Sequence, residues 1–147
     1  MYAENIESIF EEMKVPAEFD LLSIDIDGND YWLWKAITRF KPRVVVIEYN
    51  SNYPPDVSWI MKYNPKHAWE GGSHFGASLL ALEKLGASKG YSLVGCDFYG
   101  VNAFFVQREH ESKFTGPFTA ANHFEPPRFR LGTTQWTAPV LGEFVSE

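Results

Sequence analysis

Three features that often reveal a protein's role are scarce in this sequence. It has a single cysteine, Cys96, so no disulfide can form within the chain, and the apolar residues around it favour a buried thiol over a catalytic one. Lys and Arg never cluster, and the formal net charge of -6 argues against nucleic acid as a partner. No apolar stretch approaches the ~20 residues that cross a bilayer, and the acidic N-terminal segment is unlike a signal peptide. We therefore expect a cytoplasmic protein that binds neither nucleic acid nor membrane.

The remaining composition is that of a folded domain. The 147 residues suffice for one domain, 45% of them are hydrophobic and 16% are aromatic. Regular hydrophobic spacing stops near residue 110, and the residues beyond it are rich in Pro, Gly, Thr and aromatics. We therefore expect a folded body over residues 1–110 and an irregular tail over 111–147 that packs on it.

Helical and strand patterns alternate within the predicted body. Apolar residues recur every three or four positions in three predicted helices, over 4–14, 30–39 and 78–89. β-branched and apolar runs predict strands over 20–27 and 43–49, and a closing antiparallel hairpin over 92–98 and 101–108. Asn29 or Asp27 is expected to cap the helix that follows the first strand.

The fold class follows from this alternation. Residues 43–49 are apolar on both faces, which is typical of a parallel strand with helices on either side. Strands that alternate with helices form right-handed βαβ units. The sequence therefore predicts a three-layer α/β fold whose parallel strands are closed by an antiparallel hairpin. The long segment 50–77 has no clear period, and a loop of this length inside a domain is usually functional.

Acidic and amide side chains follow the two predicted parallel strands. Asp25 and Asp27 close the first strand, and Glu48 and Asn50 close the second. Ligands of open α/β sheets bind at the carboxyl ends of the strands, which lie ~4.8 Å apart. Asp25, Asp27 and Glu48 are therefore expected to meet in one crevice, where they could bind a divalent cation or raise a pKa. In the alternative interpretation, Asp27 only caps a helix and Glu48 pairs with Arg43 or Lys66.

The segment Asp25-Ile26-Asp27-Gly28 also fits the start of a haloacid-dehalogenase-type phosphatase. In such an enzyme the first Asp attacks phosphorus and the second acts as acid and base. The late acidic pair that would bind magnesium does not follow here, since Asp97 stands alone. The sequence therefore gives this phosphatase interpretation little support.

Several segments taken together resemble the FkbM-type methyltransferases. The resemblance covers roughly residues 4–108, and it depends on the order and spacing of the matching stretches. These are Phe19–Tyr31 (FDLLSIDIDGNDY), Pro42–Asn50 (PRVVVIEYN), Gly76–Gly86 (GASLLALEKLG), Lys89–Tyr91 (KGY) and Asn102–Val106 (NAFFV).

The resemblance implies the second half of a Rossmann-like class I methyltransferase fold, represented by its strands four to seven. It implies S-adenosylmethionine as cofactor and methyl transfer to an oxygen of a small molecule or sugar. Asp25 and Glu48 would be catalytic, as proton acceptors or as ligands of a cation that activates the hydroxyl, and Asp25 and Asp27 would contact the cofactor. The acceptor would be bound by Asn50, His67, Glu70 and His74.

The family's glycine-rich loop is not found in this sequence, so we expect weak or no cofactor binding by the isolated chain. The alternative function is a non-catalytic assembly module that kept the sheet without the cofactor site. A homodimer is expected, because the strand at 20–27 would leave one edge unpaired.

Overall fold

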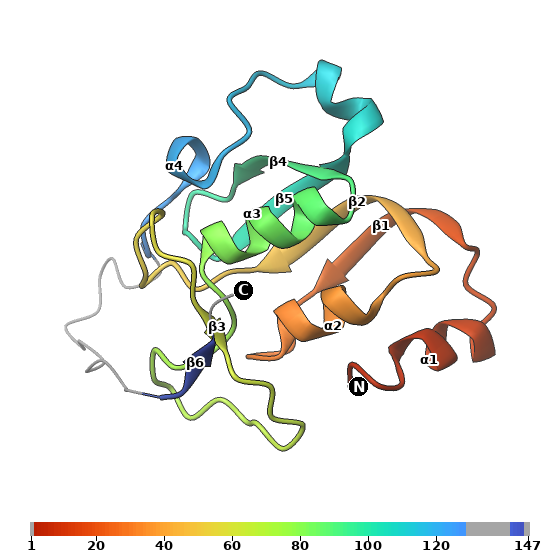
Figure 1. The fold of residues 1–147 in the computed structure, drawn as a ribbon, viewed down its shortest axis with the longest axis horizontal. Helices are drawn as coiled ribbons and strands as arrows, with labels where there is room; N and C mark the ends of the chain where they lie inside the picture. The colour runs from red at the N-terminus through yellow and green to blue at the C-terminus, as the bar shows by residue number, and fades with distance from the viewer. Residues whose placement is uncertain (1, 129–141, 146–147) are drawn as a thin grey trace.

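Four strands form the central sheet of the computed structural model, which describes residues 2–128 and 142–145 (Figure 1). Strand β1 lies at one edge, and the order across the sheet is β1-β2-β5-β4. β1 and β2 are parallel, whereas β5 is antiparallel to both of its neighbours. The strands are β1 (Glu18–Ile24), β2 (Lys41–Glu48), β4 (Tyr91–Cys96) and β5 (Asn102–Gln107). The predicted parallel pair and closing hairpin are therefore confirmed, within a mixed α/β fold.

Helices and a small second sheet surround this central sheet. The three main helices are α1 (Ile6–Glu12), α2 (Asp30–Ala36) and α3 (Leu79–Ser88). Ser78 caps α3, because its hydroxyl accepts a hydrogen bond from the amide of Ala81. The remaining elements are β3 (Ile60–Met61), the 3-10 helix η1 (Arg108–Lys113), α4 (Ala120–His123) and β6 (Phe144–Val145).

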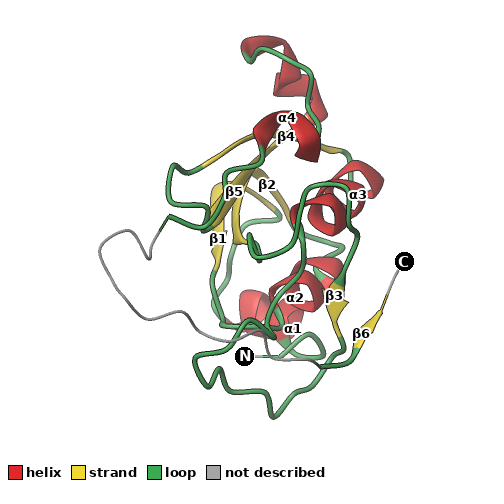
Figure 2. Cartoon of the chain, turned by 90° about the vertical axis from the view of Figure 1, so that its left-hand side faces the viewer, coloured by secondary structure: helices red, strands yellow, loops and turns green. Residues whose placement is uncertain are grey.

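The core lies between the sheet and the helices α2 and α3. Val45 and Phe105 are cross-strand partners on this face and are fully buried. Trp34 of α2 packs on Phe105 with ring centroids 4.9 Å apart, and a side chain at Gly86 of α3 would collide with both rings. Gly86 therefore allows the two helices to approach the sheet together. Figure 2 shows α1, α2 and α3 on the same side of the strands.

The opposite face of the sheet is less covered, and here the prediction of three layers is wrong for the described residues. Leu21 is 57% exposed, and its neighbours Val44 and Val46 are only half-buried. At the other side of this face, η1 covers the hairpin, where Glu111 accepts a hydrogen bond from Ser92. The apolar run of β2 predicted cover on both faces, but a sequence pattern does not reveal which element supplies it.

The boundaries of several predicted elements differ from those of the structure. β1 ends at Ile24, three residues before the predicted end, because the chain turns there toward α2. The predicted tail contains η1, α4 and β6, and β6 pairs with β3 of the predicted loop. The predicted domain boundary at 110 falls inside η1, and residues 129–141, 146 and 147 of the tail lie outside the described part.

Across residues 2–128 and 142–145, the helices are too short or too polar for any of them to span a membrane.

Candidate functional site

The turn between β1 and α2 is built around the carboxylate of Asp30. Asp30 is fully buried, and it accepts hydrogen bonds from the amides of Ile26 and Gly28, both at 2.9 Å. Burial raises its pKa, although these bonds oppose that effect. The expected caps are wrong, because no side-chain cap is formed at Asn29, whose side chain instead bonds the backbone of Asn64. The side chain of Asp30, and not that of Asn29, therefore stabilises the turn.

This turn brings three carboxylates together at the carboxyl end of the parallel pair. Asp25, Asp27 and Glu48 each offer a ligand oxygen, and these oxygens lie within 4.8 Å of one another. Their predicted proximity is confirmed, but the geometry differs from strand alternation, since Asp25 and Asp27 lie beyond the end of β1. Asp27 has a left-handed backbone with φ of 56°, a conformation that Asp tolerates better than most residues.

Glu48 is the carboxylate whose environment is most perturbed. Its Oε2 atom is buried and has no hydrogen-bond partner among the described residues. Desolvation, reinforced by the negative charges of Asp30, Asp25 and Asp27, raises the pKa of Glu48 to about 8. The alternative pairing with Arg43 is not formed, because Arg43 pairs with Asp20 on the surface. Glu48 can therefore be protonated or ionised near neutral pH, as a proton acceptor requires.

A cavity of about 170 Å³ opens beside Glu48. Four segments enclose it: the β1–α2 turn, the end of β2, the loop between β3 and α3, and the β4–β5 turn. Its walls are mostly apolar, with carboxylates at one side. The lining residues are Asp27, Glu48, Tyr49, Trp69, Gly72, Phe75, Gly100 and Val101.

The four residues predicted to bind an acceptor do not line this cavity. Asn50 is fully buried, and its amide donates to the carbonyls of Ser73 and Phe75 while its oxygen accepts from Asn52. Asn50 therefore fixes the loop that carries Trp69 and Phe75. Glu70 is exposed and lies outside the lining.

His67 and His74 line a different cavity, of about 340 Å³, which Glu143 also lines. Their ring centroids are 6.3 Å apart, and Nε2 of His74 lies 3.4 Å from the carbonyl of Glu143. His67 packs over Gly28, where any Cβ would collide with the imidazole. Its buried Nε2 has no partner among the described residues. The structure thus places the two histidines together, in a cavity that Glu48 does not line.

The sequence left open whether Trp69 covers a substrate or packs within its loop, and it did not indicate Tyr49 or Phe75 as parts of the site. Trp69 is 53% exposed, and its indole N–H donates to the carbonyl of Gly72 at 2.8 Å, which fixes the ring. Phe75 packs edge to face on Trp69, with ring centroids 6.3 Å apart. Tyr49 closes the floor, and its hydroxyl donates to the carbonyl of Glu125 at 2.7 Å. The aromatic residues of segment 50–77 were the sequence feature that could have indicated the aromatic walls of the cavity.

Cys96 lies near Tyr49 but is not a nucleophile candidate. Burial raises the pKa of its thiol to about 12, so the thiolate is not populated at neutral pH.

The chain was compared with protein-family models, with curated proteins and with solved structures, and no match was found in any of the three. The site must therefore be interpreted from its own geometry.

The cavity does not fit a complete S-adenosylmethionine molecule. Its volume of about 170 Å³ is below the ~300 Å³ at which pockets for whole small molecules begin. Gly71 and Gly72 do not directly follow a strand, since β3 ends at Met61, so they do not form the glycine-rich turn that binds a nucleotide. The space next to Glu48 suits one end of a ligand or a small hydroxyl compound.

Proposed function

We propose that this chain is the acceptor-binding half of a methyltransferase-like domain, in which Glu48 accepts the proton of an attacking hydroxyl group. The observation that carries the proposal is the buried, unpartnered Oε2 of Glu48 beside an aromatic-walled cavity. A hydroxyl that donates to this oxygen would satisfy an acceptor that is otherwise costly to bury. The parallel pair with its antiparallel closing hairpin is compatible with the fold that the resemblance implies.

In this proposal the chain supplies positioning and proton transfer. Trp69 and Phe75 would pack on the apolar side of a small molecule or sugar, and the carboxylates would receive its hydroxyl groups. S-adenosylmethionine supplies the methyl group when bound. We expect the isolated chain to bind that cofactor weakly or not at all, since the cavity is too small for it.

A divalent cation at Asp25, Asp27 and Glu48 is the second candidate for activation of the hydroxyl. The observation in its favour is the spacing of their oxygens, within 4.8 Å of one another. Calcium binds such oxygens at ~2.3–2.6 Å, so one ion could contact all three. A cation would lower the pKa of a bound hydroxyl, whose proton would then pass to solvent and not to Glu48.

Methyl transfer from labelled S-adenosylmethionine to a panel of sugars and polyols tests the proposal, in the natural protein that contains this chain. The Glu48→Gln variant is expected to lose about 100-fold or more in rate, which is typical for removal of a general base. Glu70→Gln is the matched control, because Glu70 is an exposed carboxylate on the neighbouring loop. Full activity of Glu48→Gln, or no transfer to any acceptor, would contradict the proposal and favour a non-catalytic module. Loss of activity with a chelator, restored by Mg²⁺ or Ca²⁺, would identify the cation mechanism.

A further inference from the structure

Asp25, Asp27 and Glu48 form an acidic crevice at the carboxyl ends of β1 and β2. A second, larger groove lies at the opposite end of the sheet. Its volume is about 400 Å³, and it is formed where β1, β2 and β4 begin and β5 ends. Its character is opposite to that of the acidic crevice, since cations outnumber carboxylates. The charged lining residues are Lys41, Arg43, Lys89, Arg108, Glu18 and Glu109.

The concentration of cations is unusual for this chain. Four of the 13 Lys and Arg residues of a protein with net charge -6 line the groove. Arg43 is engaged with Asp20 in an exposed pair. Lys41 is different, because its ammonium group forms no ion pair or hydrogen bond with the described residues. An exposed ammonium group that no ion pair engages is available to an anion from solution.

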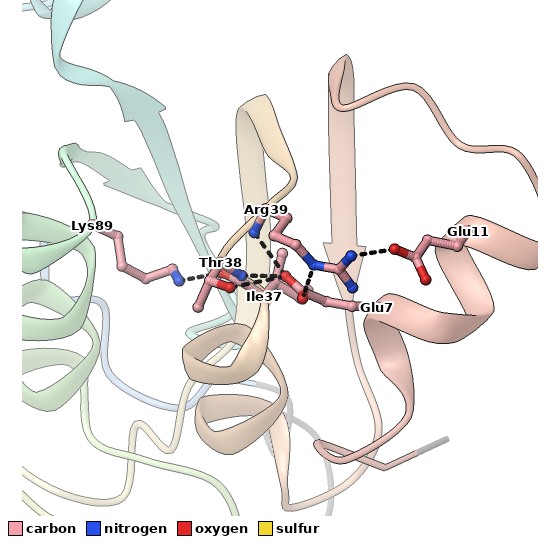
Figure 3. A network of polar contacts seen from close by, with 6 residues as sticks. All are labelled: Glu7, Glu11, Ile37, Thr38, Arg39 and Lys89. Atoms are coloured by element: carbon pink, nitrogen blue, oxygen red, sulfur yellow. Dashed lines mark hydrogen bonds and ion pairs between the residues drawn. The ribbon is translucent and has the colours of Figure 1, made fainter.

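The other two cations are held in place by backbone carbonyls and not by carboxylates. Lys89 donates to the carbonyl of Ile37 at 2.5 Å, as Figure 3 shows, and Arg108 donates to the carbonyl of Ala87 at 3.4 Å. Ile37 follows α2 and Ala87 lies in the last turn of α3, so these contacts fix both side chains at the ends of helices. A Lys has three donors and an Arg five, so most of their N–H groups remain available to a ligand.

The nearby carboxylates are largely engaged elsewhere. Glu109 lies 3.6 Å from His110, and Glu7 is bonded to Arg39 and to the amide of Thr38 (Figure 3). Lys89 forms no ion pair with the described residues, and burial lowers its pKa although the charge of Glu7 opposes this. Glu18 lies opposite Lys41 in the register of β1 and β2, and it is the one lining carboxylate with no ion pair among the described residues.

We propose that this groove binds the phosphoryl group of a small anionic ligand through Lys41, Lys89 and Arg108. A planar guanidinium and two ammonium groups match an oxyanion with several oxygens, which accepts from all three. The volume of about 400 Å³ exceeds that of a phosphate ion and lies within the range of small-molecule sites. Gly90 contributes space at the wall, because a Cβ there would meet no atom within 4 Å.

NMR titration of the ¹⁵N-labelled chain with inorganic phosphate tests this proposal. Saturable shifts are expected at the amides of Lys41, Gly90 and Arg108, and sodium chloride at equal ionic strength should not produce them. Lys41→Ala combined with Arg108→Ala should weaken phosphate binding by at least about tenfold, since each removes a charge-assisted hydrogen bond. The control is Lys66→Ala combined with Lys84→Ala, which removes two exposed cations outside the groove and should leave binding unchanged.

Glycerol phosphate separates two sources of the same phosphoryl chemistry. Tighter binding than inorganic phosphate would show that the groove also contacts the body of a phosphorylated metabolite, whereas equal binding would assign free phosphate. Shifts that stay linear to about 50 mM phosphate, or equal weakening by the control pair, would overturn the proposal. The amide spectrum of each variant shows whether it is folded, so a loss of binding is separable from a loss of structure.

Discussion

At the scale of single residues, burial assigns roles that residue type alone does not. Glu48 lies near the end of the predicted second strand and Asn50 directly follows it, and both were candidates for the site. The structure buries the Asn50 amide with every donor and acceptor bonded to the loop, whereas Oε2 of Glu48 has no partner. A side chain whose hydrogen bonds are complete is held by the fold, and one with an open acceptor is available to a ligand.

The raised pKa of Glu48 leads to a prediction about how the free energy of unfolding depends on pH. Its folded-state pKa of about 8 lies above the usual 4.5, so ionisation favours the unfolded chain. The free energy of unfolding should therefore fall as pH rises from about 4.5 to about 8 and become level above that. Glu48→Gln should remove this fall and gain on the order of 2 kcal/mol at about pH 9, after allowance for solvent screening.

Urea unfolding followed by tryptophan fluorescence, in the presence of a chelator, measures this effect. Glu70→Gln is the control, because an exposed carboxylate should not change the slope with pH. If the free energy of unfolding had the same pH dependence in wild type and Glu48→Gln, ionisation of Glu48 would not destabilise the folded chain.

At the scale of elements, the sequence predicted which helices and strands exist, and their order, better than the residues at which they end. Every predicted helix and strand of the body is present, because apolar periodicity reports which side chains are buried. The end of β1 was wrong, since Asp25 and Asp27 continue the alternation of a strand while the buried Asp30 draws the chain into a turn. The position of the aromatic side chains that wall the cavity was not predicted either. They come from a loop whose position depends on hydrogen bonds between residues far apart in sequence, such as Asn29 to Asn64.

The carboxylate of Glu7 bonds helix α1 to the backbone that follows α2, and this contact should depend on pH. Glu7 accepts from the amides of Thr38 and Arg39 and from Nε of Arg39, at 2.5, 2.7 and 2.7 Å (Figure 3). Burial alone would raise the pKa of Glu7, but these bonds together outweigh it and lower the pKa to about 2. The stabilisation is therefore present above about pH 4.5 and is lost as pH falls toward 2.

Glu7→Gln should cost about 1 kcal/mol of unfolding free energy at neutral pH, because a charge-assisted acceptor is lost. The difference between variant and wild type should shrink in acid. Urea unfolding at several pH values checks both statements. Glu12→Gln is the control on the same helix, since Glu12 is exposed. A constant difference at every pH would mean that packing of α1, and not the charge of Glu7, sets the stability.

At the scale of the whole molecule, charge and surface are distributed unevenly over the two ends and two faces of the sheet. The acidic crevice lies at the carboxyl ends of β1 and β2, and the basic groove lies at their amino ends. One face carries helices α1 to α3, whereas the other leaves Leu21 exposed beside half-buried Val44 and Val46. Two ligand sites of opposite charge can therefore coexist without competing for the same surface.

The edge of this sheet leads to the last prediction, that the protein is a homodimer. β1 pairs only with β2 among the described strands, so its other edge presents unpaired N–H and C=O groups. Of the apolar side chains on this strand, Phe19 and Leu22 are half-buried and Ile24 is fully buried, which leaves Leu21 as the exposed one. Leu21 is the middle residue of β1, which spans Glu18–Ile24. Antiparallel pairing of two copies about a two-fold axis would bring the two Leu21 side chains together.

In that register Asp20 faces Leu22 of the other copy, so no like charges stand opposite one another. Light scattering at about 10 μM should give the mass of a dimer, and Leu21→Lys should give a folded monomer because it places two ammonium groups at the axis. Met13→Lys is the control, since Met13 is 72% exposed and lies outside β1, directly after α1. A monomeric wild type would refute the dimer, and a dimer that survives Leu21→Lys would place its interface elsewhere on the molecule.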